Sequence, residues 1–378
     1  MYRIGVVGTG FIAKGLVDLL TSHKDYALSG ILTRTNIQER KDFPQNHLLT
    51  NSIDDLIRDS DLIVECSGDV IYATDTIDQI LKAGIPVVTM NSEFHITTGS
   101  YFIDKGLVTE AEGDQPGALA ILHEEAEDMG FTPLVYGNIK GFLNHSPTIE
   151  DMRFWSKKSQ ISLGMVTSFT DGTKVQIEQA LVANGLGAGI IEDGLMGMPY
   201  DDMAVGGNIL ASKAKNIGMP VSDYLLSPKL PAGVFIVVEH SGNQQAAMRY
   251  FKMGDGPYYV LERTYHLCHL EILKTIKRVL SGGGVLLDNS PEPRISVAAI
   301  AKHDLKAGDK IEKGIGSFDV RGIAVTIKDD VDHIPIGLVS DVTLRRDVAA
   351  GERLSFDDVE VPDTLAARIW KEVLAKID

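Results

Sequence analysis

The stretch YRIGVVGTGFIA, Tyr2 to Ala13, decides how the first part of the chain is expected to fold. Its apolar run YRIGVVG predicts a buried strand, and FIAKGLVDLLTSH at 11–23 has apolar residues at helical spacing. Between them, the residues from Gly8 to Ala13 match the pattern G-x-G-x-x-G/A. There the first glycine permits a tight turn, the second lets a pyrophosphate approach the backbone, and Ala13 allows close packing of helix on strand. The stretch therefore predicts a dinucleotide-binding βαβ unit.

The same alternation of strand and helix continues outward from this stretch. Apolar runs at 26–34, 61–68 and 86–91 predict further strands, and 52–60 and 70–84 predict helices, with Ser52 as an N-cap. Buried runs alternating with amphipathic helices are typical of a parallel sheet with helices on both faces. The fold class that we expect is α/β, with an N-terminal Rossmann doubly wound parallel sheet.

The composition excludes several classes of partner. The chain has 378 residues, 44% of them hydrophobic, and 36 basic against 52 acidic residues give a formal charge of −16. An acidic chain repels nucleic acid and anionic membrane, so neither is expected as a partner. There are two cysteines, no signal-peptide pattern and no apolar run long enough to span a membrane. We expect a cytoplasmic protein with reduced thiols.

We expect three domains in a chain of this length. They are an NAD(P)-binding Rossmann domain at 1–137, a central α+β substrate and catalytic domain at 138–292, and a small, mostly β domain at 293–378. The segment DNSPEPR, 288–294, is typical of a linker, and 183–208 is predicted to be a glycine-rich loop. The tail contains two similar pieces, AIAKHDLKAGDKIEKG and VTLRRDVAAGERLSFDD.

The end of the second predicted strand bears on the choice of cofactor. NAD-binding domains usually have Asp or Glu there, but this strand ends in ILTRT, which places Thr33 and Arg34 at that position. Arg34 could pair with a 2′-phosphate, so NADP is favoured, although NAD is possible; alternatively, Arg34 stacks on adenine or lies in solvent. The predicted cofactor-binding residues are Gly8, Gly10, Phe11, Ile12, Thr33, Arg34, Ser67 and Gly68.

Polar residues that follow predicted strands are candidates for substrate binding, because ligands lie at the carboxyl ends of strands in open α/β sheets. Asn91 and Glu93 follow the fourth predicted strand, and Asp114 lies in EGDQP. The alternatives are an N-cap role for Asn91 and a turn role for Asp114. His266 is a further candidate contact. With His269 it has i, i+3 spacing, but there is no clear third ligand, so no metal is expected.

Two segments contain candidate catalytic charges. Lys140 lies between small residues at the end of the predicted strand 132–138, where a compact cation can reach a substrate oxygen. In SFTDGTKVQIEQALVANGLG, Asp171, Lys174 and Glu178 have helical spacing before a nearly uncharged continuation. Buried charges need partners, so these three are expected to share a site with a polar substrate; a solvated salt bridge is the alternative. We predict a catalytic role for Lys140, Asp171, Lys174 and Glu178.

With these residues identified, the chain resembles the homoserine-dehydrogenase-like NAD(P)-dependent oxidoreductases with a C-terminal SAF domain. The resemblance rests on GTGFIA at 8–13, MNSE at 90–93, GDQP at 113–116, SFTDGTK at 168–174 and ANGLG at 183–187, which contains Asn184, a further expected substrate contact. The tail AKHDLKAGDKI is similar to the SAF module at the end of sialic-acid synthases. The best-known branch is the DRL group, which makes methylerythritol 4-phosphate from 1-deoxyxylulose 5-phosphate.

The resemblance implies hydride transfer between NADP(H) and a small polyhydroxylated or phosphorylated carbonyl compound, with Lys140 or Lys174 stabilising the alkoxide. The segment around Lys140 reads GNIKGF, whereas the DRL pattern is closer to GKGTKY, so one lysine is missing. The homoserine dehydrogenase pattern D-x-x-G-x-D-x-x-x-K is also absent. A DRL-type reductoisomerase is one alternative, and a non-catalytic NADP-binding sensor or carbohydrate-binding module is another. The resemblance also implies a homo-oligomer.

Overall fold

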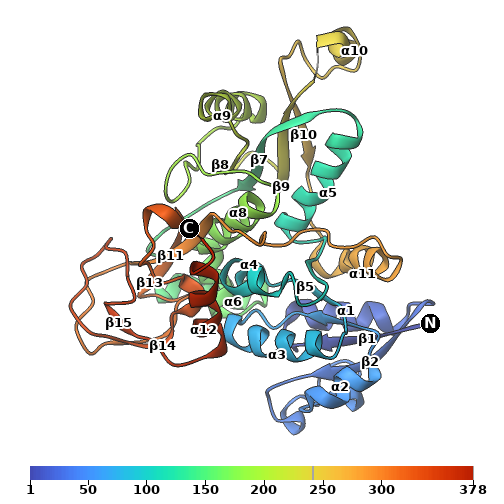
Figure 1. Ribbon diagram of the computed structural model, residues 1–378, viewed down its shortest axis with the longest axis vertical. Helices are drawn as coiled ribbons and strands as arrows, with labels where there is room; N and C mark the ends of the chain where they lie inside the picture. Colours follow the sequence, from blue (N-terminus) through green and yellow to red (C-terminus); the bar gives the residue numbers. More distant parts are fainter. Residues whose placement is uncertain (241, 378) are drawn as a thin grey trace. The chain divides into compact units, whose positions relative to one another are not determined.

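A computed structural model describes residues 1–240 and 242–377, which form two compact units (Figure 1). The first, here called the Rossmann unit, consists of Met1–Gly117, His266–Pro291 and Thr364–Lys376. The second, here called the central unit, has Ala118–Tyr265 and Glu292–Asp363 as its main segments. Both units are discontinuous in sequence. The three-domain division at 137/138 and 292/293 stays a prediction, but a unit boundary does fall inside the expected linker.

The Rossmann unit is built on a six-stranded parallel sheet, as the alternating pattern predicts. The strand order is β3-β2-β1-β4-β5-β6, which is typical of a Rossmann fold. The strands are β1 (Tyr2–Val7), β2 (Tyr26–Leu32), β3 (Leu49–Thr50), β4 (Leu62–Glu65), β5 (Val87–Thr89) and β6 (Val108–Glu110). The order reverses between β1 and β4, so the glycine loop after β1 lies at the switch point where such sheets bind dinucleotides.

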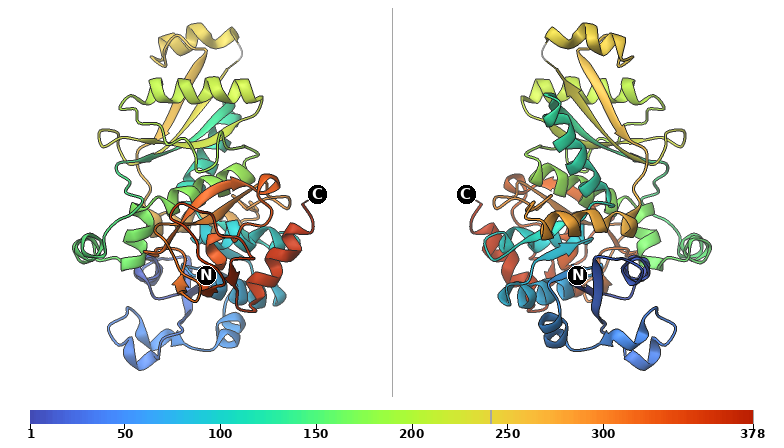
Figure 2. Two further views of the ribbon diagram at one scale, coloured as in Figure 1. Left: turned by 90° about the vertical axis from the view of Figure 1, so that its left-hand side faces the viewer. Right: turned by 90° about the vertical axis from the view of Figure 1, so that its right-hand side faces the viewer.

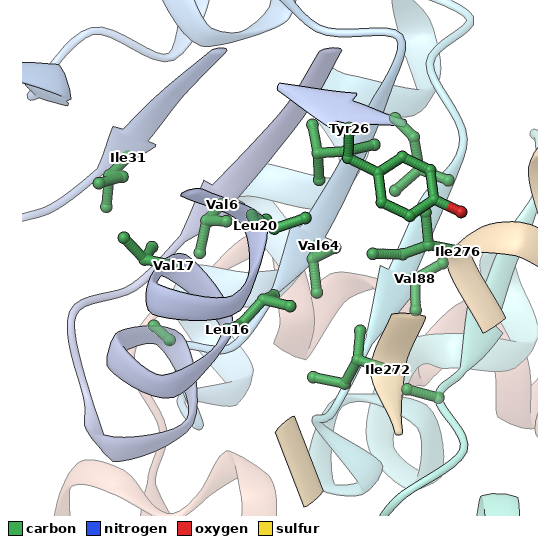
Figure 3. Close-up of a cluster of buried hydrophobic side chains, with 14 of the residues drawn as sticks. Val6, Leu16, Val17, Leu20, Tyr26, Ile31, Val64, Val88, Ile272 and Ile276 are labelled. Carbon is green, nitrogen blue, oxygen red and sulfur yellow. The ribbon is translucent and has the colours of Figure 1, made fainter. Parts of the chain in front are cut away.

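One face of this sheet carries an apolar core (Figure 3). Side chains alternate along a strand, so Val6, Val64 and Val88 point to the same side. Helix α1 (Phe11–Thr21) covers them with Leu16, Val17 and Leu20, all buried. Helix α11 (Ile272–Leu280), far along the chain, packs Ile272 and Ile276 into the same cluster. On the other face, Leu56 of α2 (Ile53–Asp59) lies against Gly5.

Helix ends in the Rossmann unit confirm some of the local signals. Ser52 accepts a hydrogen bond from the backbone N–H of Asp55 and so caps α2, as predicted. Asp69 caps α3 (Val70–Lys82) in the same way. The last helix, α12 (Leu365–Leu374), packs against α3 and α4 (Ser92–Thr98), and its Trp370 is buried. The tail was expected to consist of short strands, so α12 went unpredicted.

The central unit contains a four-stranded mixed sheet in the order β10-β9-β7-β8. The strands are β7 (Thr132–Lys140), β8 (Val221–Leu226), β9 (Gly233–Glu239) and β10 (Tyr258–Arg263). Helix α9 (Met203–Ile217) packs on the face with Val135 and Ile139. Helix α8 (Thr173–Gly185) also packs on β7, and its Glu178 bonds to Asn138 and Lys140.

The central unit has four further helices among the described residues. They are α5 (Gln115–Asp128), which begins in the Rossmann unit, α6 (Ile149–Ser159), α7 (Leu163–Thr170) and α10 (Gln245–Tyr250). Figure 2 shows α10 at the tip of the β9–β10 hairpin. The 3-10 helices of the two units are Ile37–Glu39, Asn46–Leu48, Gly99–Phe102, Gly242–Gln244, Cys268–Leu270, Ile327–Asp329 and Ile336–Leu338. Among the described residues, no helix combines the length and apolar character that crossing a membrane requires.

The tail forms two small antiparallel sheets, β11-β13 and β12-β14-β15. The strands are β11 (Ile295–Ala301), β12 (Lys310–Lys313), β13 (Val320–Thr326), β14 (Ser340–Leu344) and β15 (Val359–Glu360). The two similar sequence pieces pair with each other, because Leu305 and Val348 exchange backbone hydrogen bonds of 2.8 and 3.0 Å. The aspartate of each piece accepts a backbone N–H from the other: Asp304 from Ala350 and Asp347 from Ala307, both at 2.9 Å. The similar spacing therefore encodes a symmetric pairing.

Two predictions about the middle of the chain were wrong in part. The glycine-rich loop expected at 183–208 is confirmed between α8 and α9, but its last residues form the start of α9, capped by Asp202. Gly206 and Gly207 lie inside that helix. A Cβ at either position would meet side chains of the sheet, so these glycines allow the helix to pack closely on it. The stretch SFTDGTKVQIE is two helices, α7 and α8, separated at Gly172, which has φ +86°.

Candidate functional site

The glycine loop after β1 has the geometry of a cofactor cradle. Gly8 has φ +108°, and a Cβ there would lie 2.9 Å from the carbonyl oxygen of Cys66, so the fold itself requires glycine. Gly10 differs, because its φ is −79° and a Cβ there would meet no atom within 4 Å. Nothing in the Rossmann unit requires glycine at that position. The open space above Gly10, at the start of α1, fits the approach of a pyrophosphate to the helix N-terminus.

The end of β2 places a cation at the same edge of the sheet. Thr33 is buried, and Arg34 extends beyond it with its side chain 56% exposed. The Arg34 guanidinium donates to Asp69 at 2.8 Å and lies 4.4 Å from the ring centre of Tyr72. Asp69 and Tyr72 therefore hold the guanidinium near the carboxyl end of β2, where the adenosine end of a dinucleotide binds in this fold.

The ends of β4 and β5 are tied together by a buried carboxylate that the sequence reasoning missed. Glu65 is fully buried and accepts hydrogen bonds from the backbone N–H of Ser67 at 2.6 Å and from the Thr89 hydroxyl at 2.9 Å. Burial raises the pKa of Glu65, while the surrounding polar groups oppose that shift. Thr89 in turn accepts from the N–H of Asn91. Glu65 thus fixes the backbone at Ser67 and, through Thr89, at Asn91. Its position at the end of a predicted strand was the signal that could have identified it.

The predicted substrate contacts of the Rossmann unit lie at the carboxyl edge or beside it. Asn91 caps α4 through the N–H of Phe94 at 3.0 Å, which is the N-cap alternative, and Glu93 in the first turn is buried. Asp114, also buried, follows β6 and precedes α5. The His266 ring lies 3.4 Å from the Gln115 amide, so it is brought next to this turn. Substrate contact by these residues stays a prediction.

The central unit assembles a lysine cluster, defined here as Asn138, Lys140 and Glu178. Asn138 and Lys140 are two residues apart on β7 and therefore point to the same face of the sheet. Both donate to one oxygen of Glu178: Asn138 Nδ2 at 2.8 Å and Lys140 Nζ at 3.1 Å. The side chain of Glu178 is 1% exposed and that of Lys140 is 18% exposed. Lys140 is thus a desolvated cation that still reaches the surface, as required for contact with a substrate oxygen.

Asn138 is a residue that the sequence reasoning missed. Its Oδ1 is buried and has no hydrogen-bond partner among the described residues, so one strong acceptor beside Lys140 is unused by the protein. Buried polar atoms are normally paired, which makes such an acceptor a candidate contact for a substrate hydroxyl. The alternation of strand side chains from Lys140 back to Asn138 was the signal that could have identified it.

Asp171 does not lie on the same helix as Lys174 and Glu178, as its spacing had suggested. It is the C-cap of α7 and lies outside α8, because the chain turns at Gly172. It is fully buried and pairs with Lys302 at 2.7 Å. Glu178 pairs with Lys140. A shared substrate site for the three residues stays a prediction. Lys174 is buried in the first turn of α8. The partner of Asp171 comes from the C-terminal segment, which sequence spacing could not indicate.

Asn184 has a clear structural use. Its Nδ2 donates to the carbonyl of Ile295 at 2.8 Å, and its Oδ1 accepts from the backbone N–H groups of Arg294 and Ile295, both at 2.9 Å. The amide therefore holds the start of β11 against α8. A substrate contact by Asn184 stays a prediction. No group of three or more His, Cys, Asp or Glu with metal-binding geometry occurs among the described residues.

Comparison with known families agrees with this geometry. Residues 113–272 match the family model of the oxidoreductase DRL catalytic domain, which includes the lysine cluster. Residues 8–100 match the model of the homoserine dehydrogenase NAD binding domain, which includes the glycine loop and Arg34. A search of curated proteins finds no match.

Solved structures match the chain only at low identity and with TM-scores below 0.5. A probable dehydrogenase from Thermotoga maritima is 17% identical over 76% of this chain and 91% of that chain, with a TM-score of 0.45. A myo-inositol dehydrogenase from Corynebacterium glutamicum ATCC 13032 is 12% identical over 75% and 90%, with a TM-score of 0.44. A UDP-N-acetylglucosamine 3-dehydrogenase from Acidithiobacillus ferrooxidans is 13% identical over 76% and 92%, with a TM-score of 0.42. Similarities of this size carry no argument about the substrate.

Two family models and the open cradle at Gly10 therefore point to one activity class. The chain is an NAD(P)-dependent oxidoreductase in which a segment similar to the homoserine dehydrogenase NAD binding domain precedes a segment similar to the DRL catalytic domain.

Proposed function

We propose that the protein transfers a hydride between NADP(H) and the carbonyl carbon of a small polyhydroxylated or phosphorylated compound. The observation that carries this proposal is the lysine cluster, a mostly buried Lys140 held by the buried Glu178 within the segment that matches the DRL catalytic domain. A carbonyl that accepts a hydride also needs a cation or proton donor at its oxygen. Lys140 supplies such a group.

Each residue of the lysine cluster has its own role in the proposed reduction. The reduced nicotinamide, when bound, supplies the hydride to the carbonyl carbon. The ammonium group of Lys140 donates a hydrogen bond to the carbonyl oxygen and delivers a proton as the C–O π bond breaks, so the product is an alcohol. Glu178 keeps Lys140 oriented through the 3.1 Å hydrogen bond, and Asn138 donates to the same Glu178 oxygen at 2.8 Å. The free Oδ1 of Asn138 is suited to a neighbouring substrate hydroxyl.

Replacement of Lys140 tests this assignment. Lys140→Met is expected to lower kcat by roughly 10²- to 10⁴-fold, the usual range for loss of a general acid or oxyanion donor. Binding of NADPH alone, followed by fluorescence, is expected to stay within about twofold. The rate is measured from the absorbance of the reduced cofactor over a panel of sugars and sugar phosphates.

The matched control is Lys215→Met, which removes an exposed lysine of the same unit that pairs with Glu239. It is expected to leave kcat unchanged. If Lys140→Met keeps the wild-type kcat on an active substrate, the role of Lys140 is wrong. If neither NADPH nor NADH is consumed with any member of the panel, the proposed substrate class is wrong.

The choice of NADP rests on Arg34. Its guanidinium is held by Asp69 and Tyr72 but remains 56% exposed, so it can contact a 2′-phosphate. Arg34→Gln is expected to lower kcat/KM for NADPH by about 10-fold, the loss of one charged hydrogen bond, and to leave kcat/KM for NADH unchanged. An equal effect on both cofactors would argue for a role in adenine stacking.

A second candidate is the DRL-type reductoisomerase, favoured by the match of residues 113–272. That activity predicts NADPH consumption with 1-deoxyxylulose 5-phosphate. The single lysine of GNIKGF argues against the phosphate site of that group. No turnover above background with this substrate excludes the candidate.

Further parts of the proposal concern the whole protein. We propose that residues 293–378 contain an SAF-type module, that the protein is a homo-oligomer, and that it acts in the cytoplasm on a small molecule. The symmetric pairing of the two tail pieces supports a module of its own in the tail. Analytical ultracentrifugation tests the oligomeric state.

A further inference from the structure

A second cluster of charges lies in the central unit, apart from the lysine cluster, and includes a cation that the protein leaves without an acceptor. It is here called the cation cluster and consists of His145, Asp171, Lys302 and Arg321. Lys302 and Arg321 come from the C-terminal β segment, on either side of the β11–β13 ladder. Asp171 ends α7, and His145 lies in the loop after β7.

The ladder places the two cations on one face. Ile300 pairs with Arg321, and the next rung is the hydrogen bond from Lys302 N–H to the carbonyl of Asp319 at 2.8 Å. Side chains of paired residues share a face, as do residues two apart on one strand. Arg321 and Lys302 therefore project from the same side of the two-stranded sheet.

The charges of this cluster do not balance. Lys302 is 3% exposed and is satisfied by Asp171 at 2.7 Å and by the carbonyl of Ser317. Asp171 is also held by the N–H of Thr173 at 2.8 Å. Arg321 is partly buried, and burial lowers its pKa although Asp171 opposes that shift. Among the described residues, the Arg321 guanidinium has no hydrogen-bond or salt-bridge partner. The Asp171 carboxylate already holds Lys302, and the nearby Asp319 bonds to His303 at 3.1 Å, so neither carboxylate is hydrogen-bonded to Arg321.

His145 adds a second donor to this corner. A Cβ on Gly172 would lie 3.8 Å from the His145 ring, and Asn144 N–H donates to the carbonyl of Thr170 at 2.7 Å, so the loop is fastened beside Asp171. Burial lowers the pKa of His145; the positive charges of Arg321 and Lys302 act in the same direction, and the Asp171 carboxylate opposes them. The same loop begins at Lys140.

A partly buried guanidinium without an acceptor is costly in an isolated protein, because a desolvated charge needs a partner. The planar fork of arginine matches the two oxygens of a carboxylate or phosphate. We propose that Arg321 and His145 bind the oxyanion of a small ligand, a phosphate or carboxylate group, while Asp171 holds Lys302 beside them.

If the bound oxyanion belongs to the substrate, the substrate is an anion. Only this identification of the ligand with the substrate rests on the proposed function. The loop that follows Lys140 at the end of β7 includes His145, so one chain segment connects the lysine cluster to the cation cluster. The oxyanion site itself requires no hydride transfer.

Direct binding tests the proposal without turnover. Inorganic phosphate and acetate are titrated separately into the full protein by isothermal calorimetry, in a buffer free of oxyanions. Wild type is expected to bind at least one of them saturably. Tighter binding of phosphate identifies a phosphate ester as the natural group, and tighter binding of acetate identifies a carboxylate. No saturable binding of either anion overturns the proposal.

Arg321→Gln is expected to weaken this binding by about 10-fold or more, equivalent to about 1.4 kcal/mol. The control is Arg345→Gln, the same chemical change at an exposed arginine that occupies the position of Lys302 in the second tail piece; its affinity should equal that of wild type. If Arg321→Gln does not fold, as judged by circular dichroism, Arg321→Lys replaces it. Lysine keeps the charge but not the fork, so a several-fold loss is expected. Unchanged affinity in the folded variant overturns the proposal.

The two proposals can fail separately. Saturable, Arg321-dependent binding without any oxidation of NADPH keeps the oxyanion site and removes the proposed hydride transfer. Turnover of neutral polyhydroxylated carbonyls without oxyanion binding does the reverse.

Discussion

At the scale of single residues, Gly8 and Gly10 have the same side chain for different reasons. The left-handed backbone and the nearby Cys66 carbonyl require glycine at position 8. Position 10 has an ordinary φ and open space, so only a ligand would oppose a methyl group there. This contrast separates a requirement of the fold from a requirement of binding.

Gly10→Ala is therefore expected to change the free energy of unfolding by less than about 1 kcal/mol, since alanine is a slightly poorer N-cap but lowers the entropy of the unfolded chain. The Kd for NADPH is expected to rise by about 10-fold or more. Gly8→Ala should instead unfold at lower urea concentration. Chemical denaturation and cofactor fluorescence measure the two effects. Unchanged cofactor affinity in Gly10→Ala would place the pyrophosphate elsewhere.

Asp223 gives the central unit a pH-dependent stability. It lies on β8 and accepts backbone N–H groups of Met196, Gly197 and Tyr224. Burial raises the pKa of Asp223 from 3.8 to about 6, although those three hydrogen bonds oppose the shift. The folded state thus binds the proton more tightly than the unfolded state between these pH values.

The resulting stabilisation is present below about pH 4 and is lost as the pH rises through 6. A loss of about 3 kcal/mol is expected from Asp223 alone. Asp223→Asn should remove this component, at a constant cost of about 1–3 kcal/mol because an amide cannot accept all three N–H groups. Urea denaturation between pH 4 and 7 measures it. Asp201→Asn, at an exposed aspartate, should keep the wild-type slope. An identical slope in Asp223→Asn would contradict the assignment.

At the scale of elements, the break between α7 and α8 decides which charges meet. A continuous helix would align Asp171 with Lys174 and Glu178. The left-handed Gly172 turns the chain instead, and Asp171 ends one helix while Glu178 belongs to the next. Two clusters form where sequence spacing indicated one.

Gly172→Ala is expected to lower the free energy of unfolding by about 1–2 kcal/mol, because alanine pays the steric cost of the left-handed backbone. Its Cβ would meet His145 and Leu143 only at van der Waals distance, so no clash adds to this cost. Gly164→Ala, inside α7 with open space around it, should be neutral or stabilising. Thermal unfolding compares the two. Equal stability of both variants would mean that the turn is not required.

At the scale of the whole molecule, each unit is completed by distant parts of the chain. Helices α11 and α12 return to the Rossmann unit from residues 272 onward. Helix α12 packs against α3 and α4 with Trp370, whose side chain is 1% exposed. The cofactor-binding unit therefore depends on the last residues of the sequence.

Trp370→Ala is expected to lower the free energy of unfolding of the Rossmann unit by about 3–5 kcal/mol, because it leaves a large cavity. Bound NADPH should restore part of the lost melting temperature, since a ligand stabilises the state that binds it. Lys371→Ala, on the exposed side of the same helix, should change stability by less than about 0.5 kcal/mol. Scanning calorimetry with and without cofactor gives the readout. A melting temperature unchanged in Trp370→Ala would show that α12 is dispensable.

Local patterns were sufficient for much of the Rossmann unit. Strand, glycine turn and helix are consecutive in Tyr2–Thr21, and alternation of buried strands with amphipathic helices leads to a parallel sheet. The N-cap at Ser52 also depends only on neighbours. By contrast, α9 and α12 were not predicted. For α9 the reason is that Gly206 and Gly207 suggest a loop until the sheet that packs against them is known.

The amino-acid sequence by itself determined the cofactor fold, the glycine loop and the candidates Lys140 and Glu178, because each follows from spacing within one element. Only the tertiary structure decided the partners. Glu178 pairs with a lysine 38 residues away and Asp171 with one 131 residues away. A buried charge is stabilised by whichever opposite charge the fold brings within about 3 Å. Local periodicity carries no information about contacts at that separation.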